Sequence, residues 1–575
     1  MRAIHWLAGG CIFLGALASH AAELPNLKLI PPQANLIVQV DNPRKLAERV
    51  IRHEVTQQAL RLPFVSQAVN TADFERFLQL IAYLEKDLGA PWPELIDKLA
   101  GGGLTIAAKA GGENAPALII FRGNDESFTR KFVDRLLQVI EQEQIRTESK
   151  ERTKKASYRG IDGWQLSKDA LLTRLGSTLI FTNKNDALKA VIDLHVAGGK
   201  CLADRAEIAS ARKTLPADCH AWLWLDLAYA KESKEAKEQF ALPSNDALQL
   251  FLIGGWANTV FRAPYLLVGL YEEGEKYTLS ARLPAGRDGM PEAMALHVPP
   301  VGTGTLPLLQ PKGTLYSQSF YFDVPSIWDR RTQLFNDMIA KQFDQAQKDV
   351  GKFLPGSSLS KLLTQAGSHH RIVVATHAKK GYATEPSQVL PAFALVTTYR
   401  DPKFAKSFEG VLRGAALLAT TQLQMKMNDE VHAGTKIVYY RFDEKAKVDG
   451  DPENLRFNFT PCMASLHDQF IMCSNIELCR ELIDILNTEH ANPGKQSSPA
   501  AFRGTFYATG AADLLKSFED QLRARVILDQ AVRPEVASKR TAEIMEFVRS
   551  LGTLELGSTY EAKETRLEAT WIRKK

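Results

Sequence analysis

The chain has 575 residues, 45% of them hydrophobic and 24% charged, which is an ordinary globular composition on a chain too long for one hydrophobic core. The net charge of +5 is a small difference between 71 basic and 66 acidic residues that are mixed along the sequence. This balance argues against nucleic-acid binding. The main basic run, Arg146–Arg159, is broken by Glu148 and Glu151, so a solvated strand edge or loop is favoured there over an anionic-ligand site.

The N-terminus carries the pattern of an export signal. Arg2 precedes an apolar stretch over 4–18, and small residues follow, ending in Ser19-His20-Ala21. This order is typical of a cleaved signal peptide, predicted over residues 1–22, and places the protein in the periplasm or outside the cell. Cys11 comes too early to carry a lipid anchor. No later run reaches about 18 apolar residues, so no transmembrane helix is expected in the mature chain.

The second half of the sequence repeats the first. LIFTNKNDALKAVIDL at 179–194 returns as FIMCSNIELCRELIDI at 470–485, and other matched positions keep the same order in both halves. Between the copies, residues 284–305 are dense in proline and glycine, as in an interdomain linker. We therefore predict two homologous domains, 24–283 and 306–575, joined by that linker.

Each copy is predicted to run through the same elements in the same order. An extended segment opens it, NLIVQVDNP or TLYSQSFYFDVP, and leads through a proline into an amphipathic helix. Two apolar strands follow, LTIAA and ALIIF or RIVVA and AFALV, and then a helix whose apolar residues recur every three or four positions. Short strands, the repeated helix, one more strand and a hairpin complete the copy.

This succession predicts the fold class. Short strands joined by few residues have to be antiparallel, because parallel neighbours need long crossover connections. Strands that come in runs interrupted by helices favour an α+β fold over strict βαβ alternation. We expect each domain to be an antiparallel sheet backed by helices on one face.

Three segments of the first copy, IPPQANLIVQVDNP at 30–43, YRGIDGWQL at 158–166 and the repeated LIFTNKNDALKAVIDL, resemble a domain-of-unknown-function family of secreted bacterial proteins. The chain looks like two tandem copies of that domain. The resemblance implies the α+β fold and export from the cytoplasm. It implies no catalytic residues and leaves the function open.

The cysteines offer two possible disulfides. Of six cysteines, Cys11 lies in the signal peptide, which leaves five. Cys462 and Cys473 flank a predicted two-residue hairpin, and Cys201 and Cys219 bracket a short helix, so a bridge is feasible in each pair. The hairpin register makes Cys462 and Cys473 a hydrogen-bonded pair, in which the side chains lie farther apart than in a non-hydrogen-bonded pair. Free thiols are therefore the alternative for these two cysteines. Cys479 is expected to be a small buried residue on a helix.

Three clusters could bind an ion or a phosphate, and none is favoured as a site. His369 and His370, near His377, sit at a strand entry where adjacent side chains point to opposite faces, so a solvated strand entry is favoured over a metal site. Asp449–Asn454 lacks the spacing of a helix-loop-helix calcium site and is interpreted as an acidic turn. Gly101–Gly103 precedes a strand, whereas a phosphate-binding glycine loop opens a helix.

The function therefore stays open among three readings. The sequence contains neither G-x-S-x-G nor H-E-x-x-H, and no catalytic, cofactor-binding or metal residue is assigned and no cofactor expected. A non-catalytic binding or structural envelope protein is favoured, with partners unknown. A hydrolase with a site in a cleft between the copies is one alternative. The other is a carrier of an apolar ligand, because Trp222 with Trp224, and Tyr316 with Phe320 and Phe322, line either a core or an apolar groove.

Overall fold

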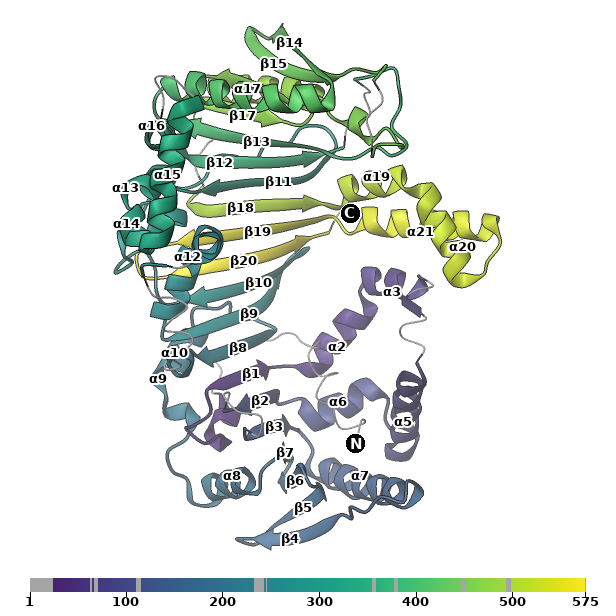
Figure 1. Cartoon of the computed structure of the whole chain (residues 1–575). Helices are drawn as coiled ribbons and strands as arrows, with labels where there is room; N and C mark the ends of the chain where they lie inside the picture. The colour runs from purple at the N-terminus through teal and green to yellow at the C-terminus, as the bar shows by residue number, and fades with distance from the viewer. Residues whose placement is uncertain are drawn as a thin grey trace. The chain divides into compact units, whose positions relative to one another are not determined.

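The computed structural model describes residues 24–62, 65–66, 71–109, 115–231, 242–244, 246–353, 358–376, 381–446, 450–492 and 498–573. The predicted signal peptide lies outside the described residues. The chain divides into two compact units (Figure 1). The first unit runs to Ala230 and resumes over Pro264–Ala281, and the second comprises Lys231–Ala263 and Arg282–Lys575.

The first unit is built on an antiparallel sheet. Its strands are β1 (Leu36–Val40), β2 (Leu104–Ala108), β3 (Ala117–Arg122), β4 (Lys154–Tyr158), β5 (Ile161–Ser167), β6 (Ala170–Leu175), β7 (Thr178–Thr182), β8 (Ala221–Asp226), β9 (Tyr265–Glu273) and β10 (Lys276–Leu283). Neighbouring strands pair in the order β4-β5-β6-β7-β3-β2-β1-β8-β9-β10.

The second unit repeats this sheet strand for strand. Its strands are β11 (Thr314–Tyr321), β12 (Ala366–Ala375), β13 (Ala392–Tyr399), β14 (Met425–His432), β15 (Thr435–Phe442), β16 (Cys462–Leu466), β17 (Gln469–Cys473), β18 (Ala500–Tyr507), β19 (Thr553–Tyr560) and β20 (Thr565–Ile572). They pair in the order β14-β15-β16-β17-β13-β12-β11-β18-β19-β20. The predicted α+β class, with antiparallel sheets backed by helices, is confirmed.

Helices surround both sheets. Those beginning in the first unit are η2 (Pro25–Leu29), α2 (Pro43–Arg52), α3 (Glu54–Arg61), α5 (Ala72–Leu88), α6 (Trp92–Ala100), α7 (Glu126–Arg146), α8 (Asn185–Ala197), η3 (Leu202–Asp204), α9 (Ala206–Arg212) and α10 (Ala228–Lys231). Those of the second are α12 (Ala247–Arg262), η4 (Glu292–His297), α13 (Val324–Asp329), α14 (Arg331–Leu334), α15 (Asp337–Phe353), α16 (Leu359–Gln365), α17 (Lys403–Leu423), η5 (Leu455–Asn458), α18 (Ile476–Ala491), α19 (Ala508–Ser517), α20 (Glu519–Gln530) and α21 (Pro534–Ser550). Several begin at a capping side chain, as where Asp125 accepts the backbone N–H of Phe128.

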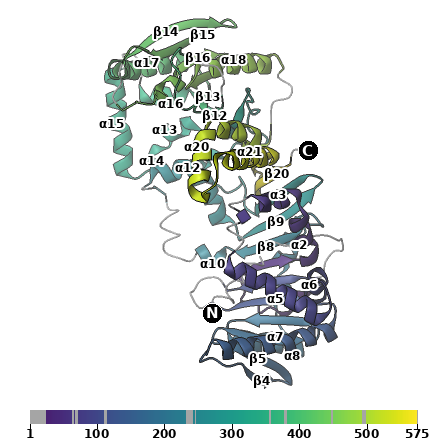
Figure 2. The ribbon, with the colours of Figure 1, turned by 90° about the vertical axis from the view of Figure 1, so that its right-hand side faces the viewer.

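Helices pack on both faces of each sheet, rather than on the one face that was expected. In the second unit, α18 covers one face, where it buries Leu482 against Ile471, and α17 covers the other, where Phe404 packs on Phe470. Figure 2 shows α17 and α18 on opposite sides of β16. Strands such as ALIIF at 117–121 carry apolar residues at consecutive positions, so both of their faces need cover.

The unit boundary differs from the predicted one. The α12 helix, placed by sequence in the first domain, buries Leu250 in an apolar cluster of the second unit. The predicted linker 284–305 belongs to the same cluster, because Ala293–Leu296 are buried within it. Its glycines serve close packing, since a Cβ on Gly286 would overlap the backbone of Glu561.

The predicted disulfides are not formed, because all five described cysteines carry free thiols. Cys462 and Cys473 do face each other across the β16–β17 hairpin, as expected. Burial, reinforced by the neighbouring thiols, raises the pKa of Cys462 well above its usual value, which suppresses the thiolate that disulfide formation needs. The Cys219 thiol instead donates to the carbonyls of Ala221 and Leu270, at 3.2 and 3.4 Å.

Candidate functional site

One face of the second sheet is left without a helix over its middle. Figure 1 shows β11, β12, β18 and β19 face-on between α15 on one side and α19 on the other, with no helix drawn across their central residues. The side chains on this face are the candidate site. Its chemistry follows from the strand register.

The register aligns apolar side chains in a transverse row on this face. Direct pairing across six strands joins, in order, Phe393, Val374, Tyr316, Phe506, Leu554 and Trp571. We call these residues the second-sheet row. At about 4.8 Å between strands, the row is about 24 Å long. Phe393 is 56% exposed, Phe506 44% and Leu554 38%, and the other three side chains are half-buried.

The first sheet carries a row at topologically equivalent strands. Direct pairing joins Ile119, Ile106, Val38, Leu223 and Val268, all half-buried, and we call these residues the first-sheet row. The residues that precede them in sequence point to the opposite face and are buried; for example, Ile37 is 0% and Trp222 2% exposed. The same face is therefore less well covered in both units.

The exposed face is the apolar one. Along β19 and β20 the side that carries the second-sheet row presents Leu554, Leu556, Ala569 and Trp571, while Glu555 and Glu568 point to the other side. A sheet with one wet face normally turns its polar residues to water. Exposed apolar surface is unfavourable by about 25 cal/mol for each Å², so an extended patch marks a surface that binds a ligand or a partner.

The centre of the second-sheet row is an aromatic pair. The rings of Tyr316 and Phe506 lie 4.3 Å apart between centroids, and the Tyr316 hydroxyl donates to Gln318 Oε1 at 2.7 Å. The neighbouring Gly504 leaves room for the Tyr316 ring, since a Cβ there would come within 3.0 Å of the hydroxyl oxygen. The row thus offers flat apolar area with two polar side-chain atoms, the Tyr316 hydroxyl and Trp571 Nε1, and both already donate hydrogen bonds within the chain.

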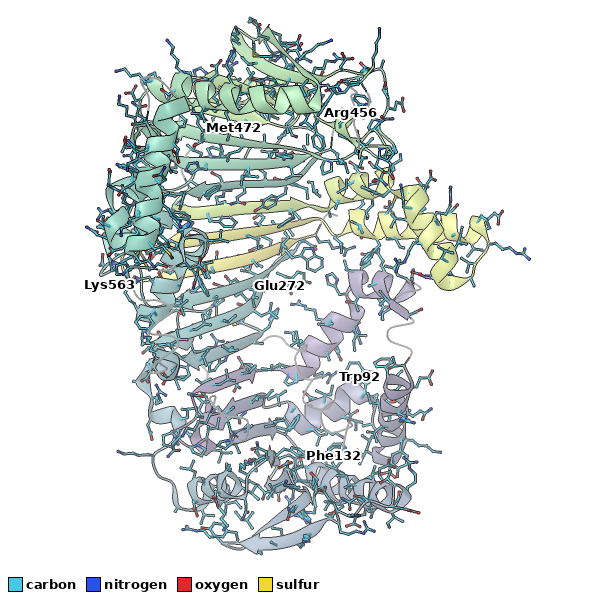
Figure 3. All side chains as sticks on the ribbon, viewed as in Figure 1. Trp92, Phe132, Glu272, Arg456, Met472 and Lys563 are labelled. Carbon is cyan, nitrogen blue, oxygen red and sulfur yellow. The ribbon has the colours of Figure 1, made fainter. Side chains whose placement is uncertain are left out.

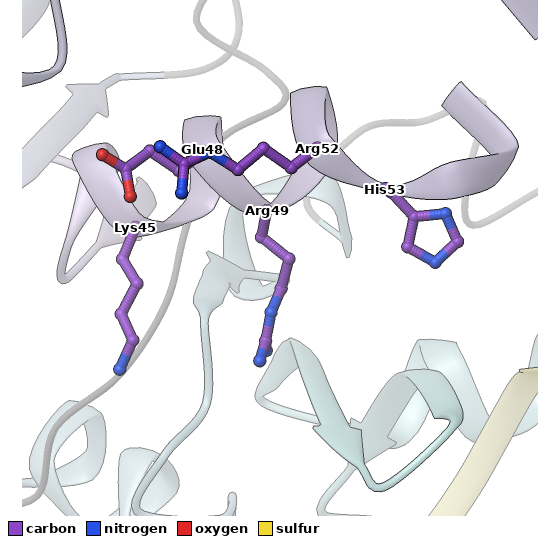
Figure 4. A pocket seen from close by; sticks show the side chains of 5 residues that line it. All are labelled: Lys45, Glu48, Arg49, Arg52 and His53. Atoms are coloured by element: carbon purple, nitrogen blue, oxygen red, sulfur yellow. The ribbon is translucent and has the colours of Figure 1, made fainter. Parts of the chain in front are cut away.

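A basic helix borders the corresponding face of the first sheet. Lys45, Glu48, Arg49, Arg52 and His53 of α2 line an open hollow of about 370 Å³. Figure 4 shows Lys45 and Arg49 extending from the same side of the helix. The spacing of four residues between them explains this, because residues one turn apart share a helix face.

Arg49 is held in place by the sheet. It forms an ion pair with Glu272, at the end of β9, and lies 3.4 Å from His220 Nε2. Figure 3 labels Glu272 at the end of its strand. Burial lowers the pKa of His220, outweighing the hydrogen bond to the Glu272 carboxylate that would raise it. His220 is therefore neutral near pH 7, and the carboxylate of Glu272 is engaged by Arg49.

This polar cluster does not form a catalytic set. Cys219, next to His220, is the nearest candidate nucleophile, but burial raises the pKa of its thiol to about 11. Its sulfur already donates to two backbone carbonyls. A thiol that stays protonated and engaged in this way is a poor nucleophile.

As the sequence suggested, His369 and His370 point to opposite faces of β12, but both are hydrogen-bonded within the protein rather than solvated. His370 is buried and contacts the Thr397 hydroxyl at 2.9 Å and the Phe322 carbonyl at 3.0 Å. His369 contacts the Gly304 carbonyl at 2.8 Å. The expected solvated entry was wrong because 284–305 packs over it, and His377 lies outside the described residues. Within the described ranges, no group of three or more His, Cys, Asp or Glu side chains could hold a metal ion.

The other clusters are structural. In the acidic turn, Asp449 lies outside the described residues, and Asp451 accepts from the Leu455 backbone and the Arg456 guanidinium at 2.7 and 2.6 Å. Gly101–Gly103 precedes β2, as expected. The basic run does form an exposed strand, β4, at the edge of its sheet.

The aromatic residues divide between core and open face. Trp222 and Trp224 are buried in the main core of the first unit. Phe322 packs in the cluster around α12. Tyr316 instead lies in the second-sheet row, so for this residue the apolar surface, rather than the core, is the alternative that the structure favours. Sequence reasoning missed Phe393, Phe506, Leu554 and Trp571; alternation predicted their strands, but only the pairing register aligns them.

Comparison with known proteins identifies no family. No family model matches the sequence, and no curated protein matches it. Three crystal forms of TP0453 are similar to 45–48% of this chain over 79–87% of their own length, with 9% identity and TM-scores of 0.23 to 0.25. A TM-score in that range does not establish a common fold. Separately, no helix among the described residues is long and apolar enough to span a membrane.

Proposed function

We propose that this chain is a non-catalytic, exported binding protein that holds apolar ligands on the open face of each sheet. The observation that carries the proposal is the second-sheet row, where Phe393, Phe506 and Leu554 stay exposed on the face that the strand pattern makes apolar. Apolar area with few polar groups is the usual lining of a ligand site. The hydrolase alternative has less support, because the first unit's ionisable cluster is occupied by its own ion pair.

Two further parts of the proposal rest on sequence. We infer that the halves arose by duplication, which is supported by the identical strand order and by the repeated segment at 179–194 and 470–485. We also keep the export signal at 1–22 and the resemblance to a domain-of-unknown-function family as parts of the proposal. Duplication would account for the presence of an equivalent apolar row in each unit.

Binding of an apolar fluorescent dye tests the proposal. Phe506→Ser and Phe393→Ser should each weaken binding of Nile red to the second unit about tenfold, because each removes a ring worth ~1.4 kcal/mol of contact. Val431→Ser is the matched control, since Val431 is 72% exposed on β14, away from the row. Equal losses in all three variants, or none in the row variants, would reject the row as a binding surface.

A further inference from the structure

The α2 helix of the first unit combines positive charge with contact to the open sheet face. Its sequence PRKLAERVIR holds four cationic side chains and one carboxylate, Glu48. Glu48 is engaged by Arg44, at 3.1 Å. Lys45, Arg49 and Arg52 line the hollow, so the hollow is predominantly cationic.

An adjacent side of α2 packs on the sheet beside the first-sheet row, and Arg49 itself reaches Glu272 of β9. Leu46 and Val50 contact Val40, Leu104 and Ala221. Val40 and Ala221 are directly paired, and each lies two residues along its strand from a member of the row. Two residues of strand span about 7 Å. Glu272, the partner of Arg49, lies four residues along β9 from Val268 of the row and on the same face, about 13 Å away. The cationic hollow and the apolar row therefore lie on the same face of one sheet.

We propose that the first unit binds an ionised long-chain fatty acid, with its carboxylate at Lys45, Arg49 and Arg52 and its tail along the first-sheet row. This inference rests on the proposed function and names its ligand class. A guanidinium matches a carboxylate through two parallel hydrogen bonds. Arg49 contacts Glu272 and His220 through Nη1 alone, so its other N–H groups can donate to a second carboxylate. The row of Ile, Val and Leu side chains, about 19 Å long over its five strands, offers an uncharged track for one tail.

Displacement of the uncharged dye N-phenyl-1-naphthylamine from the purified full chain tests this assignment. Palmitate should displace the probe at lower concentration than dodecyl maltoside, which has an uncharged head group. Lys45→Glu and Arg52→Glu should each weaken palmitate binding about tenfold, because a charge-assisted hydrogen bond is lost, while leaving the maltoside unchanged. Arg130→Glu makes the same charge change at an exposed position of α7 and should alter neither.

Each other outcome overturns a distinct claim. If palmitate and maltoside compete equally, or if Arg130→Glu weakens palmitate as much as Lys45→Glu does, the head-group site is wrong while apolar binding stands. If phosphatidylglycerol vesicles bind the chain and monomeric palmitate does not, the cations contact a membrane surface and the fatty-acid assignment fails. If no amphiphile displaces the probe and Nile red does not bind either, the proposed function itself fails.

Discussion

Burial keeps four histidines of this chain uncharged near neutral pH. Desolvation is the largest cause that lowers the pKa of His220, His297, His369 and His370. In the second unit, His297 contacts the Phe251 carbonyl through Nε2, and its ring lies 4.9 Å from that of Phe322. Its Nδ1 is buried without a partner, so a proton there would add an unsatisfied charge to an apolar cluster.

This burial predicts acid sensitivity. An unfolded histidine titrates near 6.5, and the folded ones titrate lower, so between these values the unfolded chain binds more protons. The free energy of unfolding should thus be highest above pH 6.5 and fall as the pH drops through 6.5 toward the folded pKa values. His297→Gln, which keeps a donor for Phe251, should reduce the loss between pH 7.5 and 5.5. This loss is measured from the urea midpoints of the second unit at the two pH values. If the variant and the parent chain showed the same pH dependence, the role of His297 would be contradicted.

At the scale of single elements, one buried ion pair fastens α18 to the sheet. Arg371 of β12 is 0% exposed and contacts Glu489 near the end of α18 at 2.6 Å. It also donates to the Pro307 carbonyl and to Gln469 of β17. Burial lowers the pKa of Arg371, and Glu489 opposes that shift. The pair thus joins two strands, a helix and the segment that directly follows the predicted linker.

Breaking this pair should be costly. Glu489→Gln leaves the Arg371 charge buried without its counter-ion, and we expect a loss of about 3 kcal/mol in the free energy of unfolding of the second unit. Asp529→Asn breaks an exposed pair with Arg525 on α20, at 2.6 Å, and should have no measurable effect. Chemical denaturation of both variants makes the comparison. Similar small changes in both would mean that water reaches Arg371.

At the scale of the whole molecule, the chain leaves the first unit before completing it. After β8 the chain enters the second unit, where α12 packs, and it returns to the first unit for β9. Segments adjacent in sequence therefore support different cores. Leu250 belongs to the core that contains Phe335 and Tyr560, although it precedes β9 in sequence.

Hydrogen exchange can test whether α12 packs with the second unit. Leu250→Ala removes a buried side chain and should destabilise the second unit by about 2–5 kcal/mol. Exchange should accelerate in 324–345 and 500–507, which pack in the same cluster, and stay unchanged in β1 and β8. If the faster exchange fell in β1 and β8 instead, α12 would belong with the first unit, as the contiguous division at residue 283 implies.

The succession of strands and helices followed from local pattern. Alternation in TLELGSTY and the three-to-four spacing of Phe404 and Phe408 report which side of an element is apolar, and that information lies within a few residues. The similarity between 179–194 and 470–485 could also be seen in the sequence, because it requires only a comparison of the two segments. Such patterns say which face is apolar, but not whether anything covers it.

By itself, then, the sequence determined the α+β class, the antiparallel strands and their order along the chain, since these depend on residue periodicity and short connections. Only the tertiary structure decided that α12 and 284–305 pack with the second unit, and that Phe393 and Trp571, 178 positions apart by their numbers, belong to one row. Strand pairing and side-chain packing bring together residues that are far apart in sequence. Whether an apolar side chain is buried therefore depends on which other segments of the chain cover it, and a local pattern does not contain that information.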